Sequence, residues 1–170
     1  LLSSAISIYG EPNLSSIKNE NKVGKNQKKI DKSEYYLIKD SNEIDDWIKE
    51  AEEIGEVAVD TETSSLDPHQ ADLIGVSLST RIGKACYIPI GHKSKKCIKK
   101  DIVLKKLKPL LEDPSIKKIG QNIKFDFIVL FKNGINISSM EDTMLMSYVL
   151  DAGKNRHNMD ILSEIHLNHK

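Results

Sequence analysis

The chain contains only two cysteines, Cys86 and Cys97, and no Cys-x-x-Cys pair. Two cysteines cannot build the disulfide framework of a small secreted domain, and without a paired motif no zinc site is indicated. We therefore expect two reduced thiols in a cytoplasmic protein. The sequence also has no apolar run of about 18 residues, so no membrane-spanning helix and no membrane partner are predicted.

The chain has no excess of charge of either sign, because Lys plus Arg and Asp plus Glu each number 25. A net charge of zero argues neither for nor against a nucleic-acid partner. With 39% hydrophobic and 29% charged residues, the 170-residue chain has the composition of a globular protein and is long enough for one domain with a core.

Residues 1–33 lack a helical or strand period, and the stretch 11–33 consists mostly of Lys, Asn, Ser and Glu. This composition predicts a flexible linker or tail. A linker at the start of the chain indicates a piece of a larger protein.

From residue 34 onward the pattern is globular. Runs typical of strands cover 35–38, 56–61, 73–79, 85–90 and 117–120, and helical spacing of apolar residues covers 41–54, 101–111, 122–132, 142–150 and 158–168. The three consecutive strands at 56–90 are separated by short polar breaks, which favours an antiparallel meander. The order of elements predicts an α/β fold with a mixed sheet and helices packed on it.

Asp60 and Glu62 end the strand at 56–61 and project from the same face, about 7 Å apart at Cα. Val57 and Val59 point to the opposite face, into the core. Paired carboxylates are ligands that a hard cation such as Mg²⁺ prefers. By itself, an Asp-x-Glu at a strand end is also typical of a solvated turn.

A second polar element, GQNIKFD, lies where the strand at 117–120 turns into a helix. Asn122 is predicted to be the N-cap of this helix, and Asp126 follows one turn later on the same face. The apolar stripe of the helix is predicted on the opposite face, at Ile123, Phe127, Leu130 and Phe131. An exposed helical Asp without a special role is the alternative interpretation of Asp126.

The motifs VAVDTETSSLDP and GQNIKFD, about sixty residues apart, resemble the first two exonuclease motifs of the DEDD superfamily. More closely, the chain is similar to the 3′→5′ proofreading exonuclease domain of bacterial family-A DNA polymerases, the DNA polymerase I family. The stretches LIGVSLS, CYIPIGH and DTMLMSYVLDAGKNRHNMDIL match that family too, so the resemblance covers residues 35–170.

The resemblance implies a ribonuclease-H-like α/β fold, with three antiparallel strands followed by a parallel strand. It also implies hydrolysis of the 3′-terminal phosphodiester of DNA with release of nucleoside monophosphates. The implied cofactors are two divalent ions, Mg²⁺ or Mn²⁺. Asp60 would bridge both ions, Glu62 would hold the first, and Asp126 would reach the second.

The resemblance further implies a set of substrate contacts and partners. The partners would be a single-stranded or frayed 3′ end of DNA and a polymerase domain in the same parent chain, in the bacterial cytoplasm. Residues 34–170 would form the exonuclease domain. The implied substrate contacts are Thr63, Leu66, Gln121, Asn122, Phe125, Met144 and Arg156.

The family completes its site with a third motif, Tyr-x-x-x-Asp, and no such motif follows Asp126 in this sequence. Tyr148 and Asp151 are only three residues apart, and we expect Tyr148 and Val149 to lie in a helix core. The expected domain is therefore C-terminally incomplete, and the 170 residues alone should be nearly inactive even where the parent is active.

Two other functions remain open. The domain could be a lapsed structural part of a polymerase, although the presence of all three carboxylates argues against decay. It could instead be an RNA-trimming exonuclease of the ribonuclease D type, which shares the first two motifs. The matches at GQNIKFD and RHNMDIL favour the polymerase family.

Overall fold

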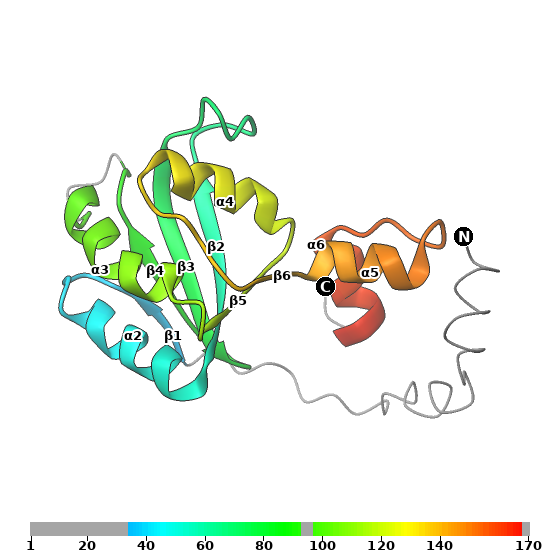
Figure 1. Cartoon of the computed structure of the whole chain (residues 1–170), viewed down its shortest axis with the longest axis horizontal. Coiled ribbons are helices and arrows are strands. Elements are labelled where there is room, and N and C mark those ends of the chain that lie inside the picture. The colour runs from blue at the N-terminus through cyan, green and yellow to red at the C-terminus, as the bar shows by residue number, and fades with distance from the viewer. Residues whose placement is uncertain (1–33, 93–96, 168–170) are drawn as a thin grey trace.

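The computed structural model describes residues 34–92 and 97–167 (Figure 1). The strands are β1 Glu34–Leu37, β2 Glu56–Thr63, β3 Leu73–Arg81, β4 Lys84–Pro89, β5 Lys117–Gly120 and β6 Met140–Asp142. The helices are α2 Glu43–Ile54, α3 Lys100–Glu112, α4 Ile123–Lys132, α5 Thr143–Asp151, the short α6 Met159–Leu162 and the π-helical turn η2 Ser163–Leu167. The expected tail at 1–33 lies outside the described residues.

Within this described part the strands form one mixed sheet in the order β1-β4-β3-β2-β5-β6. β2, β3 and β4 make the predicted antiparallel meander, and β5 runs parallel to β2. The predicted α/β class is confirmed. The edge positions of β1, parallel to β4, and of β6, parallel to β5, are not visible in the sequence, because these pairings join segments that are far apart along the chain.

One face of the sheet carries the hydrophobic core. α2 and α3 lie side by side against it, as Figure 1 shows. Val57 and Val59 of β2 point into this core as expected, and Trp47 and Leu107 meet them from the helices. The predicted apolar sides of the first two helices are therefore confirmed.

The other face of the sheet borders a cavity of about 800 Å³ whose opposite wall is formed by α5, α6 and η2. α5 has no buried residue, and Tyr148 and Val149 are 56% and 80% exposed. The prediction that these two residues lie in a helix core is wrong. An apolar stripe shows that a helix face would gain from burial, but among the described residues the ring of Tyr148 meets only that of His157, edge to face, and stays mostly exposed.

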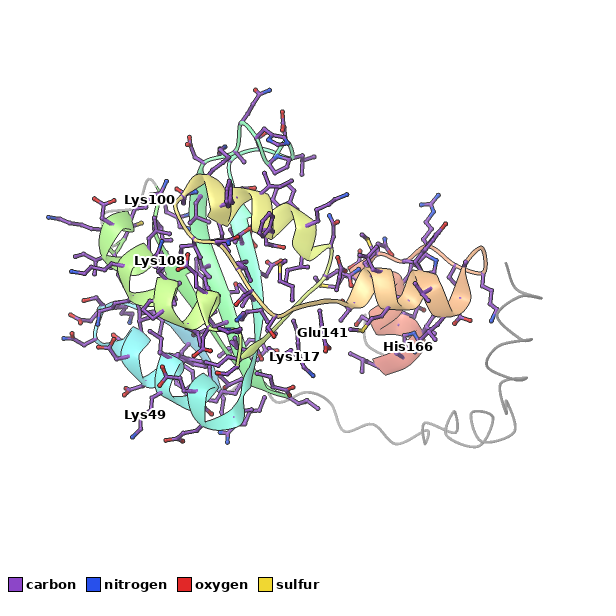
Figure 2. All side chains as sticks on the ribbon, viewed as in Figure 1. Lys49, Lys100, Lys108, Lys117, Glu141 and His166 are labelled. Carbon is purple, nitrogen blue, oxygen red and sulfur yellow. The ribbon has the colours of Figure 1, made fainter. Side chains whose placement is uncertain are left out.

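The segment after α4 is fastened to the sheet by charged groups. Lys117 of β5 and Glu141 of β6 form an ion pair of 3.2 Å between two neighbouring strands (Figure 2). Asp142, which is buried, then caps α5 by accepting hydrogen bonds from the amides of Met144 at 2.9 Å and Leu145 at 3.3 Å. None of the described helices is long and apolar enough to cross a membrane.

Asp142→Ala should lower the free energy of unfolding by about 2 kcal/mol, because it removes a helix cap and leaves three partly buried amides, those of Asn122, Met144 and Leu145, without their acceptor. Asp142→Asn keeps one acceptor oxygen and should cost less. Urea denaturation checks both variants, with the exposed Asp160→Ala as the control. An Asp142→Ala protein within about 0.5 kcal/mol of the parent, the range of ordinary surface substitutions, would contradict this role.

Candidate active site

Asp60 and Glu62 occupy the end of β2 as the strand alternation predicts. Val57, Val59 and Thr61 are buried on the core face, whereas Asp60 is half-buried and Glu62 is exposed on the other face. In the antiparallel pairing with β3, Asp60 lies opposite Ser77 and Glu62 lies opposite Gly75. The two carboxylates therefore project from the sheet face that borders the large cavity, and Asp60 lines that cavity.

Asp126 approaches the same end of β2 from helix α4. One of its carboxylate oxygens, Oδ1, accepts hydrogen bonds from the Thr61 amide at 2.8 Å and from the Thr61 hydroxyl at 2.6 Å. These bonds hold Asp126 against the residue that lies between Asp60 and Glu62, and its charge acts on Asp60.

The prediction that Asp126 lies opposite the buried stripe of its helix is wrong. Asp126 is only 3% exposed and shares the buried side with Val129 and Leu130, whereas Phe131 is 59% exposed. The physical reason is the pair of hydrogen bonds with Thr61, which satisfies a buried carboxylate. Hydrophobic spacing alone assigns an Asp to the solvent side.

The end of β5 explains why the amide of Thr61 donates to Asp126 of helix α4 and not to a neighbouring strand. β5 pairs with β2 only as far as Ile119 opposite Ala58, and the chain turns into α4 soon afterwards. Beyond that point the amide of Thr61 has no strand residue on the β5 side. The carboxylate of Asp126 supplies the missing acceptor in line with the strand.

The turn between β5 and α4 also corrects the prediction for Asn122. This residue occupies the N-cap position but has a left-handed backbone, with φ of 59°, and its side chain makes no capping bond. Asn is one of the few non-glycine residues that tolerate this conformation. Its amide instead donates to Asp142 Oδ1 at 3.0 Å, which ties the turn to the start of α5.

The three carboxylates carry uncompensated like charge. Burial, followed by the charges of Asp126 and Glu62, raises the pKa of Asp60 from its ordinary value to about 6. Burial also raises the pKa of Asp126, while the hydrogen bonds from Thr61 act in the opposite direction. Burial and both neighbouring charges disfavour the charged form of Asp60, which is the situation that a bound cation relieves.

The fit of this cluster to a divalent ion is chemical rather than geometric. The donors are carboxylate oxygens, which hard cations prefer. Among the described residues, however, no group of three or more His, Cys, Asp or Glu side chains is arranged to hold an ion. The hydrogen bonds of Asp126 Oδ1 with Thr61 account for part of this, since that oxygen is already engaged.

The predicted substrate contacts are less closely gathered. Gln121 lines the same cavity as Asp60, and its side chain bridges the His157 carbonyl at 2.8 Å and the Thr143 hydroxyl at 2.5 Å. In the loop after β2, Leu66 is 96% exposed. The remaining predicted contacts are Thr63, whose hydroxyl donates to the Ser65 carbonyl, Phe125, which packs against the core, Met144, in the first turn of α5, and Arg156, which is exposed.

Sequence reasoning missed Thr61 and Asp142, which hold the cluster and its neighbouring turn in place. Thr61 follows Val57 and Val59 on the core face of β2, and no role was predicted for it. Its position between the two carboxylates, together with a hydroxyl that must be satisfied when buried, was the available signal. It also missed Tyr87, whose hydroxyl hydrogen-bonds His92 Nε2.

The chain is similar to proteins of one known family. A family model described as 3′-5′ exonuclease matches residues 35–169. DNA polymerase I of Rhizobium leguminosarum is 43% identical over 161 residues, covering 82% of this chain and 16% of that protein. DNA polymerase I of Pseudomonas aeruginosa is 42% identical over 142 residues, covering 80% of this chain and 16% of that protein.

Solved structures of an exonuclease-like fold resemble the chain as well. Brucella melitensis NrnC with bound Mg²⁺ is 27% identical with a TM-score of 0.59, covering 80% of this chain and 62% of that chain. The same protein bound to pGG gives the same identity and TM-score, covering 61% of that chain. These likenesses confirm the expected ribonuclease-H-like arrangement of the sheet and helices.

In the absence of metal, the contribution of Asp60 to the free energy of unfolding should fall as pH rises from about 4 to 7. The pKa of Asp60 is raised to about 6 in the folded state, so the folded protein binds more protons than the unfolded chain in this window. Urea denaturation in EDTA at several pH values measures the slope. Asp60→Asn should flatten the slope and the exposed Asp46→Asn should not; equal slopes for all three proteins would contradict the raised pKa.

Proposed function

Because this chain belongs to the 3′–5′ exonuclease family found in family-A DNA polymerases, we propose that it forms the metal-dependent site that hydrolyses the 3′-terminal phosphodiester of DNA. The observation that carries the proposal is the meeting of Asp60, Glu62 and Asp126 at the end of β2. Their uncompensated negative charge at a cavity wall supports a cation-dependent reaction.

Each carboxylate has a proposed task. Asp60 would contribute to holding both ions, Glu62 would help to hold the first, and Asp126 would help to hold the second. When bound, Mg²⁺ or Mn²⁺ supplies the Lewis acidity that phosphodiester hydrolysis requires. Thr61 keeps Asp126 beside Asp60 through its amide and hydroxyl, so the chain itself fixes the separation of the two ligands. The Mg²⁺-bound structure of NrnC supports divalent metal dependence.

The proposed substrate contacts lie around this end of β2. Leu66 is an exposed apolar side chain three residues after β2 ends and is available to pack against a terminal base. Arg156 carries a guanidinium suited to a phosphate. Thr63, Gln121, Asn122, Phe125 and Met144 are proposed to contact the 3′ nucleotide, with support from the place of Gln121 in the cavity that Asp60 lines.

The parent protein is proposed to be a DNA polymerase whose polymerase domain follows in the same chain. The chain spans about a sixth of the length of the two polymerase relatives, which supports a domain at 34–170 within a longer protein. The proposed substrate is a single-stranded or frayed 3′ end. An RNA-trimming function is the alternative. The structure of NrnC bound to pGG supports testing short nucleotide substrates as well.

Metal titration tests the proposed ligands. The 170-residue chain should bind Mn²⁺ in titration calorimetry, and Asp60→Ala or Glu62→Ala should abolish that binding because each removes an anionic donor. The exposed Asp46→Ala, on α2, is the matched control and should bind as the parent does. Unchanged Mn²⁺ binding by Asp60→Ala would refute the metal assignment.

The nuclease assay tests the reaction itself. With Mn²⁺ or Mg²⁺, single-stranded DNA labelled at its 3′ end should release labelled mononucleotides slowly, at least about a hundredfold below an ordinary turnover of about 10 s⁻¹, because no Tyr-x-x-x-Asp follows Asp126. Asp60→Ala should abolish the release. A normal rate would contradict the need for the third motif, and cleavage that starts within the strand would contradict an exonuclease.

An RNA oligonucleotide of the same sequence separates the two substrates. We expect release from DNA to exceed release from RNA. Preference for RNA would favour the RNA-trimming alternative, and the absence of any Asp60-dependent release from either, at protein in excess over substrate, would favour a lapsed structural domain.

A further inference from the structure

Gly75 leaves a gap beside Glu62 that another residue fills. Glu62 and Gly75 lie directly opposite each other in the β2–β3 ladder, so side chains at the two positions share one face at a Cβ separation of about 5 Å. A Cβ built on Gly75 would meet the Tyr87 hydroxyl oxygen at 2.0 Å. The hydroxyl of Tyr87 therefore stands where the cross-strand partner of Glu62 would begin.

Tyr87 reaches this position from the next strand. It pairs with Ser77 in the β3–β4 ladder, on the face that carries Asp60 and Glu62, and its ring leans across β3 toward Gly75. His92 holds the far end of the ring. Its Nε2 hydrogen-bonds the Tyr87 hydroxyl, and the two rings meet edge to face with centroids 5.6 Å apart.

The Tyr87 hydroxyl is suited to donate a hydrogen bond. Burial, followed by the charge of Glu62, raises the pKa of Tyr87, so the phenol keeps its proton at neutral pH. When His92 Nε2 carries the hydrogen of their shared bond, the phenolic hydrogen is free to point elsewhere. The carboxylate whose charge acts on this phenol is that of Glu62, which lies opposite Gly75 in the ladder.

We propose that Tyr87 is a positioning residue that donates a hydrogen bond to the carboxylate of Glu62 and thereby orients it toward the divalent ion, with His92 fixing the direction of the bond. This inference rests on the proposed metal-binding role of Glu62. Glycine is required at position 75 because any larger residue there would displace the Tyr87 hydroxyl.

The need for such a partner follows from the exposure of Glu62. Asp60 is half-buried and Asp126 is held by Thr61, but Glu62 is exposed at the strand end on a side chain with three rotatable bonds. Ordering a side chain of this kind on metal binding costs rotamer entropy. A hydrogen bond from a fixed phenol offsets that cost and raises the affinity for the ion.

Mn²⁺ titration of the 170-residue chain tests the inference without relying on turnover. Tyr87→Phe keeps the ring and removes only the hydroxyl, and it should raise the Kd for Mn²⁺ roughly tenfold, as loss of a partner of a metal ligand commonly does. Tyr36→Phe, which removes a half-exposed hydroxyl on β1, should leave the Kd unchanged. Gly75→Ala displaces the hydroxyl without deleting it and should act in the same direction as Tyr87→Phe.

A double-mutant cycle separates positioning from general stability. In a Glu62→Asp background, whose shorter carboxylate cannot meet the Tyr87 hydroxyl in the same way, Tyr87→Phe should have less than a twofold further effect. An equal effect in both backgrounds would overturn the inference, as would a Tyr87→Phe Kd equal to that of the parent. Weaker binding of oligo-dT with unchanged Mn²⁺ affinity would also overturn it, because Tyr87 would then act on the substrate.

Including Asp60→Ala in the same titration distinguishes failure of the role of Tyr87 from failure of the proposed metal site. If Asp60→Ala abolishes Mn²⁺ binding while Tyr87→Phe leaves it unchanged, the metal site stands and the role of Tyr87 falls. If Asp60→Ala has no effect, the metal site itself falls. The urea midpoint of each variant shows that the compared proteins are folded.

Discussion

Beyond the point where β5 stops pairing with β2, the carboxylate of Asp126 supplies the hydrogen-bond acceptor that a neighbouring strand would otherwise supply. By accepting from the amide and hydroxyl of Thr61, it fixes helix α4 against the end of β2 and satisfies a buried amide that the sheet no longer pairs. Asp142 serves the same purpose one step along the chain, where it accepts from the amide of Asn122 and caps α5. Buried carboxylates thus hold together the region in which the candidate site is built.

This way of ending a sheet has an electrostatic cost. It places the carboxylate of Asp126 near those of Asp60 and Glu62, and burial, followed by the charges of Asp126 and Glu62, raises the pKa of Asp60 in the folded chain. A protein selected only for stability would avoid such a cluster. The cost is understandable if a divalent ion compensates the charge, so the feature that strains the ion-free chain is the one that supports its proposed function.

The two faces of the sheet have different roles: one packs the core and the other carries the candidate site. One face is packed with aliphatic side chains under α2 and α3, while the other carries Asp60, Ser77 and Tyr87 and borders the large cavity. Period-two alternation lets one strand serve both purposes. Gly75 extends this arrangement across strands, because its missing side chain gives the Tyr87 hydroxyl room beside the exposed carboxylate.

Local patterns along the sequence were enough to predict the mixed α/β fold, the antiparallel meander and the common face of Asp60 and Glu62, because alternation and helical spacing are local properties of the chain. The folded structure was needed to show that Asp126 is buried, that Asn122 has a left-handed backbone and makes no side-chain capping bond, and that the Tyr87 hydroxyl lies against Gly75, opposite Glu62. Each of these depends on a partner from a distant segment, and local patterns carry no record of which buried polar group will find which partner.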